Sequence, residues 1–198
     1  IRWFMDHFTG NPSASYDELQ AEAQGIQAGS EGILFVPHFG GRVLPNNPYV
    51  KGSFVGLDWK HTRGHMYRSI LEGIAYEYSY YFDILKKLYP QTAFKEMFSI
   101  GGGAKSALFN QIKSDVLGLP VTTFEMGDTA LVGSAVIAGV GAGVLKDYRT
   151  PIDTVVKKGK RYVPNMDSHA VYKKYASEYL CVIDSLTDLY KSEIYKVE

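Results

Sequence analysis

Cysteine is almost absent from this sequence, which has Cys181 as its single example among 198 residues. One cysteine cannot form an internal disulfide, so a disulfide-rich secreted scaffold and a cysteine metal cluster are both excluded. A reducing, cytoplasmic location is therefore expected. The sequence also lacks an apolar run of the ~18 residues that a membrane span needs, and its start lacks a charged-then-apolar targeting pattern. No membrane association is expected.

An excess of charge of either sign is lacking as well. The 21 lysines and arginines balance the 21 aspartates and glutamates, and no basic run alternates with aromatic residues. A surface that binds a phosphate backbone needs a concentrated basic patch. Nucleic acid is therefore not expected as a partner.

The chain does have enough apolar material for a core, since 45% of its residues are hydrophobic and 21% are charged. This composition predicts one domain spanning residues 1–198. The chain opens on Ile1 without an initiator methionine, and residues 2–8 already have the composition of an aromatic-rich helix. Our interpretation is that the sequence is a fragment that begins inside a longer protein.

Hydrophobic periodicity predicts alternating helices and strands. The expected helices cover residues 15–29 (with Ser13 or Ser15 as N-cap), 62–88, 104–117, 129–145 and 168–190, and the expected strands cover 32–36, 52–57, 95–100 and 120–124. Helix 62–88 is expected to be buried along its length, and the last helix to pack across the outside of the sheet. The polar stretch 146–164 is expected to be a surface excursion. The fold class is therefore α/β.

The residues with the clearest chemical signal lie at 97–106, with the sequence MFSIGGGAKS. An apolar strand ends in Gly101, Gly102 and Gly103, and a helix is expected to begin at once at Ala104. Backbone N–H groups would then lie open at the positive end of a helix, with no side chain in the way of a phosphate or nucleotide. The alternative is that three glycines only make a tight turn between a strand and a helix.

Two known glycine motifs can be tested against this stretch. The phosphate-loop motif fails, because alanine and not glycine precedes Lys105. The dinucleotide motif is a near match, since Gly101, Gly103 and Ser106 give G-x-G-x-x-S. Glu125 ends the next expected strand, where a ribose-binding acid is required. An NAD-binding domain therefore stays open as the rival interpretation.

A second and longer pattern lies upstream of the glycines. The strand sequence GSFVGL at 52–57 leads into a helix that carries HMYRSILE at 65–72. This pattern resembles the second signature of the FGGY carbohydrate kinase family, in which a G-x-[apolar]-x-G-[apolar] strand precedes a helix with a polar residue, a small residue and an acid. The resemblance continues in order through residues 2–4, the loop after Pro37, and residues 46–48, 71–75, 101–106, 115–121 and 133–143.

The resemblance implies a fold of the actin-like ATPase superfamily, a ribonuclease H-like domain with a mixed sheet flanked by helices. This chain would be the C-terminal domain. Gly101–Ala104 is similar to the adenosine motif of that superfamily, and Gly133–Gly143 is similar to its second interdomain connecting helix. The two phosphate motifs, the first connecting helix and the catalytic aspartate would all precede Ile1, in an N-terminal domain that would be the partner of this one.

The resemblance also implies the chemistry. The whole enzyme would bind ATP with Mg²⁺ and transfer the terminal phosphoryl group to a hydroxyl of a small sugar, and the fragment alone would be inactive. Gly101, Gly102, Gly103 and Ala104 would bind the nucleotide, and Gly103 and Ala104 would face the base and ribose of ATP or ADP through their backbone. Ala107 stands where many family members have a nucleotide-contacting asparagine, so Asn110, one turn further, is a candidate replacement. Arg2 aligns with a polar residue that lies near the nucleotide in relatives.

The sugar is the least specified part of this interpretation. Relatives often have Gly-Glu-Arg-Thr-Pro where this chain has GGRVLP at 40–45, so Arg42 and Pro45 persist while the acid and the threonine are lost. Residues 46–48 are similar to the sequence found in xylulose kinases, which makes D-xylulose the first expectation. Glycerol, gluconate, ribulose and a deoxy-sugar stay open, as does a non-catalytic actin-like scaffold.

Several other polar residues are expected to be structural. His38, His61 and His65 lack the spacing of metal ligands and are expected to form hydrogen bonds, so no metal site is predicted. Glu72 lies in an apolar helix and is expected to be a hydrogen-bonded strut, because a buried carboxylate needs partners. Four tyrosines are expected to divide between the core and a subunit contact of a possible homodimer: Tyr76, Tyr78, Tyr80 and Tyr81.

Overall fold

The structure is a computed structural model that describes residues 1–10, 15–192 and 195. Its helices are α1 (Arg2–Phe8), α2 (Tyr16–Gln24), α3 (Arg63–Leu88), α4 (Ala107–Leu117), α5 (Thr129–Gly141), α6 (Arg149–Val155) and α7 (Met166–Tyr190). Its strands are β1 (Leu34–Val36), β2 (Ser53–Val55), β3 (Met97–Phe98), β4 (Val121–Phe124) and β5 (Lys158–Tyr162), and its 3₁₀ turns are η1 (Ser30–Gly32) and η2 (Gly102–Lys105).

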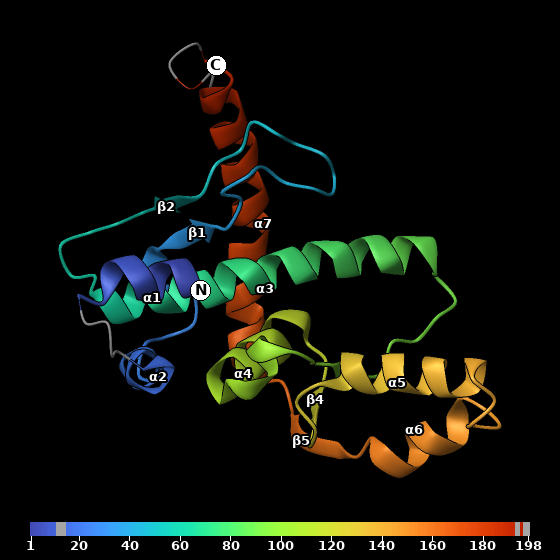
Figure 1. Cartoon of the computed structure of the whole chain (residues 1–198). Coiled ribbons are helices and arrows are strands. Elements are labelled where there is room, and N and C mark those ends of the chain that lie inside the picture. Colours follow the sequence, from blue (N-terminus) through green and yellow to red (C-terminus); the bar gives the residue numbers. More distant parts are fainter. Residues whose placement is uncertain (11–14, 193–194, 196–198) are drawn as a thin grey trace.

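The strands form two sheets that share no strand within the described residues. One sheet is the antiparallel pair β1–β2, and the other has the order β3-β4-β5, in which β3 and β4 are parallel and β4 and β5 are antiparallel. Helix α3 packs on β1, α4 packs on β4 and β5, and α3 and α4 pack on each other (Figure 1). The expected α/β class with a mixed sheet is confirmed.

The core lies where α3, α4 and α7 meet. Tyr67, Leu71, Ile112 and Tyr172 are almost completely excluded from solvent. At Gly73 the backbone of α3 comes so close to β1 that an added Cβ would lie 2.1 Å from a carbonyl oxygen of that strand. Glycine at this position therefore allows α3 to lie directly on the first sheet.

Helix α3 is not buried along its whole length, contrary to the expectation. Its buried residues stop at Glu77, and its C-terminal half extends past α7 (Figure 1). Leu85 and Leu88 are 41% and 65% exposed there. Phe82, which fits the apolar spacing, packs on Phe94 with 5.2 Å between the ring centroids. The apolar spacing thus continues beyond the part of the helix that other elements cover.

One expectation about the C-terminal third is also wrong. Helix α7 packs on α3, α4 and β1 rather than across the outside of a sheet, although Tyr172, Tyr179 and Ile183 do share its buried side. The stretch 146–164 lies mostly at the surface, as expected, and it also contains α6 and β5, which were not predicted. Strand β5 completes the second sheet and buries Tyr162.

The ends of the predicted helices also differ. Ser15 caps α2 by accepting the backbone N–H of Glu18 at 3.2 Å, as expected, while Ser13 lies outside the described residues. Helix α2 ends at Gln24 rather than at residue 29, and α5 ends at Gly141 rather than at 145. Val136 is the one fully buried residue of α5, so this apolar helix is largely uncovered by the described chain.

Glu72 is the expected strut. Its carboxylate accepts hydrogen bonds from the N–H of Gly29 at 3.1 Å, the hydroxyl of Ser30 at 2.7 Å, Nε of Arg68 at 2.8 Å and the hydroxyl of Tyr172 at 2.8 Å. These donors come from the α2–η1 connection, α3 and α7. One buried carboxylate therefore joins three segments that are distant in sequence.

Candidate nucleotide site

The glycine loop connects β3 to α4 through a 3₁₀ turn. Gly101 has φ +74°, a conformation that favours glycine, and the N–H of Ala104 donates to its carbonyl at 3.1 Å. The α-helix begins at Ala107 and not at Ala104 as expected. The reason is the N-cap, because the side chain of Ser106 accepts the N–H of Phe109 at 3.1 Å.

The loop is held from behind by two buried side chains of α4. Asn110 is completely buried, and its Nδ2 donates to the carbonyl of Ala104 at 2.7 Å. Nζ of Lys113 donates to Oδ1 of Asn110 at 2.9 Å and to Oγ of Ser99 at 2.6 Å. Burial lowers the pKa of Lys113 to about 8. The amide of Asn110 is therefore hydrogen-bonded to the backbone of the loop and is not accessible to solvent.

The front of the loop faces a cavity of about 740 Å³. Gly102 and Gly103 form one wall, and an added Cβ at Gly102 would meet no described atom within 4 Å. The opposite wall comes from the start of the chain and from α2. The described residues that line it are Ile1, Ser15, Tyr16, Asp17, Gln20, Tyr67, Leu71, Gly102, Gly103, Lys105, Ser106 and Phe109.

Gly101 and Ala104 face a second cavity of about 360 Å³ on the other side of the loop. Glu125, at the end of β4, lines the same cavity. This juxtaposition of a glycine loop and an acid is the one that the dinucleotide interpretation requires. The geometry by itself is thus compatible with either kind of nucleotide.

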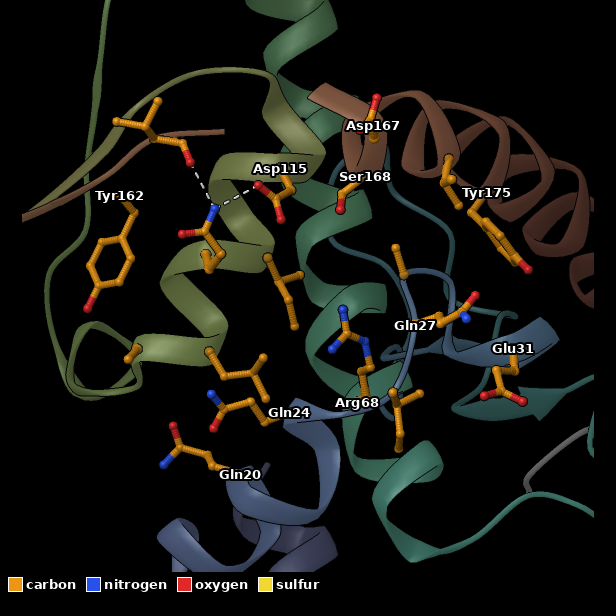
Figure 2. A pocket seen from close by; sticks show the side chains of 18 of the residues that line it. Gln20, Gln24, Gln27, Glu31, Arg68, Asp115, Tyr162, Asp167, Ser168 and Tyr175 are labelled. Atoms are coloured by element: carbon orange, nitrogen blue, oxygen red, sulfur yellow. Dashed lines mark hydrogen bonds between the residues drawn. The ribbon is translucent and has the colours of Figure 1, made fainter. Parts of the chain in front are cut away.

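Ala107 lines a third and larger cavity of about 970 Å³, between α2, α4, β5 and α7. Figure 2 shows Gln20 and Gln24 projecting from α2 into this space. Gln20 lines both this cavity and the one in front of the glycines, and its Oε1 accepts the hydroxyl of Ser106 at 2.5 Å. The side chain of Gln20 is therefore part of the wall between the two spaces.

Arg2 lies apart from these cavities. Its side chain is 79% exposed and forms an ion pair with Asp6, with 2.9 Å between Nε and Oδ1. Arg2 is not among the described residues that line the three spaces, whereas its neighbour Ile1 is. The structure thus places Gly102, Gly103 and Ile1 at one cavity. Gly101 and Ala104 line the second cavity and Ala107 lines the third. The side chain of Arg2 is exposed to solvent.

The histidines make hydrogen bonds, as expected. Nδ1 of His61 accepts the N–H of Asp58 at 2.8 Å, Nδ1 of His65 accepts the N–H of Thr62 at 3.2 Å, and His38 lies 3.3 Å from Glu77. No group of three or more possible metal ligands occurs among the residues that the structure describes. In the same part of the chain, no helix is long and apolar enough to cross a bilayer.

Comparison with known proteins identifies the family of this chain. Residues 3–142 match the sequence model of the C-terminal domain of the FGGY family of carbohydrate kinases. This chain belongs to that family. The matched range covers the FGGY-like signature, the glycine loop and α5, so it includes every stretch on which the resemblance was based except for Arg2 and Gly143 at the two ends.

Individual relatives agree with this assignment. A xylulose kinase from Staphylococcus epidermidis is 27% identical over 180 residues, which are 90% of this chain and 36% of that protein. A gluconokinase from Bacillus subtilis is 29% identical over 184 residues, covering 87% of this chain and 35% of that protein. The solved xylulose kinase from Rhodospirillum rubrum superposes with a TM-score of 0.81 at 25% identity, over 96% of this chain and 38% of that one. The FGGY chain thus spans little more than a third of these relatives.

Gln20 and Tyr16 were not predicted as site residues. Both lie on α2, far from the glycine loop in the sequence. Gln20, for example, is 86 positions from Ser106, whose hydroxyl donates to it. A short polar helix carries no local signal of what it will face after folding. The only hint was the Ser15 cap, which fixes where α2 begins and hence which side chains share its sides.

Proposed function

We propose that this chain is the nucleotide-binding half of an ATP-dependent sugar kinase, folded as one ribonuclease H-like domain of the actin-like ATPase type. The observation that carries the proposal is the cavity in front of Gly102 and Gly103, inside the range that matches the FGGY family. Its partner would be the N-terminal part that relatives have and this sequence does not include. A cytoplasmic location, where ATP is available, belongs to the same proposal.

The cavity suits the base and ribose of ATP. Gly102 and Gly103 would approach the ribose through backbone groups, since they lack side chains that would fill the space. The ring of Tyr16, which is 41% exposed at the cavity, would stack on the base. Mg²⁺ would be held mainly by the ATP phosphates and the N-terminal part, and it would neutralise charge on the transferred phosphoryl group.

D-xylulose is the proposed acceptor, in line with the xylulose kinases among the relatives. Arg42, the residue of the sugar-linked loop that persists, is buried and pairs with Glu77 at 3.0 Å while its guanidinium lies 4.2 Å from the ring centroid of Tyr80. These contacts support a role for Arg42 in holding the loop. Val43 and Leu44 at its tip are exposed. Another sugar or polyol is the main alternative, because the gluconokinase has a similar identity to this chain over a similar length.

The nucleotide proposal is tested by titrating the ¹⁵N-labelled chain separately with ADP and NADH to millimolar concentration. We expect saturable shifts with ADP at residues 101–106 and at Tyr16. Gly102→Trp should abolish them by filling the cavity, whereas Gly40→Trp, in an exposed loop, should not. A preference for NADH would favour the dinucleotide alternative, and no response to either would favour a non-catalytic scaffold.

The chain alone should not phosphorylate any sugar, because the general base and the phosphate motifs are expected in the N-terminal part. Release of ADP from ATP is measured with xylulose, glycerol and gluconate in turn, by a coupled assay. Turnover of any of these substrates by the purified chain would contradict the proposal that the general base and the phosphate motifs lie in the N-terminal part.

A further inference from the structure

Among the polar side chains that line the cavity in front of the glycine loop, the ammonium of Lys105 only donates, and Ser15, Tyr16 and Tyr67 each carry a single hydroxyl. Asp17 can only accept hydrogen bonds, and the hydroxyl of Ser106 already donates to Gln20 and accepts from Phe109. Asn110 is closed off by the loop itself. Gln20 is the amide among the described lining residues, and an amide both donates and accepts.

Gln20 is held in one orientation. Its Oε1 accepts the hydroxyl of Ser106 at 2.5 Å, and its Nε2 donates to Oδ1 of Asp17 at 3.3 Å. The backbone beneath it is fixed, because the neighbouring Leu19 is buried. One N–H of Nε2 and one lone pair of Oε1 are left for a ligand. The contact with Asp17 therefore fixes which end of the amide is the donor, because a carboxylate can only accept.

Tyr16 lies one turn before Gln20 on the same side of α2 and lines the same cavity. A flat ligand that stacks on the Tyr16 ring would thus present an edge to the Gln20 amide. The cavity combines a stacking surface, an oriented amide and glycines that leave room for a sugar. These are the elements of a site that recognises a nucleoside by its base.

We propose that Gln20 is the residue that selects adenine, with its amide hydrogen-bonded to the base edge. This inference rests on the proposed nucleotide function and specifies how the site reads its ligand. Adenine presents an amino donor beside a ring-nitrogen acceptor, which complements Oε1 and Nε2. Guanine presents a carbonyl acceptor in place of the amino group, and that carbonyl would face Oε1. Turning the amide over to fit guanine would place Oε1 against the carboxylate of Asp17 and lose the hydrogen bond that Nε2 donates to it.

The test compares dissociation constants for ADP and GDP, measured by NMR titration of the 198-residue chain and its variants. The unaltered chain should bind ADP about tenfold more tightly than GDP. Gln20→Leu should bring this ratio close to one. Gln20→Glu should favour GDP, because a carboxylate accepts from the two adjacent donors of guanine. Gln24→Leu is the matched control, one turn further along α2 and facing only the larger cavity, and should keep the ratio.

The outcomes separate the two levels of the proposal. ADP binding with an unchanged ADP-to-GDP ratio in both Gln20 variants would overturn the role of Gln20 and leave the nucleotide site intact. An equal loss of affinity for ADP and GDP in Gln20→Leu would show that Gln20 only holds the loop, and would also overturn it. No binding of ADP by the unaltered chain would overturn the proposed function and the inference together. Thermal unfolding of each variant confirms that it is folded.

Discussion

Nζ of Lys113 lies 2.6 Å from Oγ of Ser99, so a buried side chain of α4 bonds to a side chain of the segment that leads into the glycines. The same ammonium donates to Asn110, which in turn holds the carbonyl of Ala104. Both ends of the glycine loop are thus tied to one helix. The shape of the loop depends on hydrogen bonds that a ligand cannot reach.

Lys113 should make stability depend on pH in the alkaline range. Its native pKa of about 8 lies below the value of about 10.4 in an unfolded chain. Between these values the unfolded state binds more protons, so the free energy of unfolding should rise as the pH increases from 8 to 10. Lys113→Met should lose this rise, as measured by urea denaturation at several pH values. Lys105→Met, at an exposed site of the loop, should keep it. A rise that persists in Lys113→Met would contradict the assignment.

Gly73→Ala should be destabilising by about 1–3 kcal/mol, because its Cβ would lie 2.1 Å from the carbonyl oxygen of Phe35 and would push α3 away from β1. Gly133→Ala is the matched control in α5, where an added Cβ meets no described atom within 4 Å. That substitution should stabilise by about 0.5–1 kcal/mol, as alanine is the better helix former. Urea denaturation measures both. Equal effects of the two changes would show that the close approach at Gly73 is not required.

Glu77→Gln should reduce the stability of the fold at neutral pH. The variant should then lose less stability in acid than the unaltered chain does. Burial tends to raise the pKa of Glu77, but His38, Tyr179 and Arg42 outweigh burial and lower it. A carboxylate with a lowered pKa contributes stability above the unfolded value of about 4.3, and this contribution disappears as the pH falls through the native pKa.

We expect a loss of about 3 kcal/mol at pH 7 in Glu77→Gln, since Arg42 would remain buried without its charge partner. Thermal unfolding between pH 3 and pH 7 tests both effects. The exposed Glu178→Gln should follow the unaltered chain. If the thermal stability of Glu77→Gln falls as steeply in acid as that of the unaltered chain, His38, Tyr179 and Arg42 do not lower the pKa of Glu77 as described.

Ala107→Asn should raise the affinity for ADP. The residue begins α4 next to Ser106 and lines the larger cavity, which Gln20 separates from the one in front of the glycines, so an amide there can add one hydrogen bond to a bound nucleotide that reaches past Gln20. One such bond corresponds to about a three- to tenfold lower dissociation constant. Ala170→Asn, on the exposed side of α7, should have no effect. Isothermal titration with ADP measures both, and an unchanged affinity in Ala107→Asn would place the base elsewhere.

The sequence indicated those parts of the fold that carry a local signal. Helix α3 was expected at 62–88 and occupies 63–88, and α4 has its predicted end at Leu117, because Gly118 follows with φ +64°. Strand β5 was missed because Lys158, Lys160 and Arg161 give it no apolar alternation. Its charges suit the edge of a sheet, where it pairs with β4 alone.

Helix α6 was missed although it has a start signal. The carboxylate of Asp147 accepts hydrogen bonds from the N–H groups of Arg149 and Thr150 at 2.8 Å and 2.7 Å, and it thereby caps the first turn of the helix. At the site, the glycine loop was predictable because its chemistry lies in ten consecutive residues. The Gln20 contact was not, because it depends on how α2 docks after folding.

Helix α4 packs on α3 and α7 and touches β4 and β5, and its first turn adjoins the glycine loop (Figure 1). A ligand that orders this turn restrains every element in contact with the helix. Amide protons in α7 and β5 should therefore exchange with solvent more slowly once the cavity is filled, although no ligand atom comes near them. Filling of the cavity would thus be detectable in the core of the domain as well as at its surface.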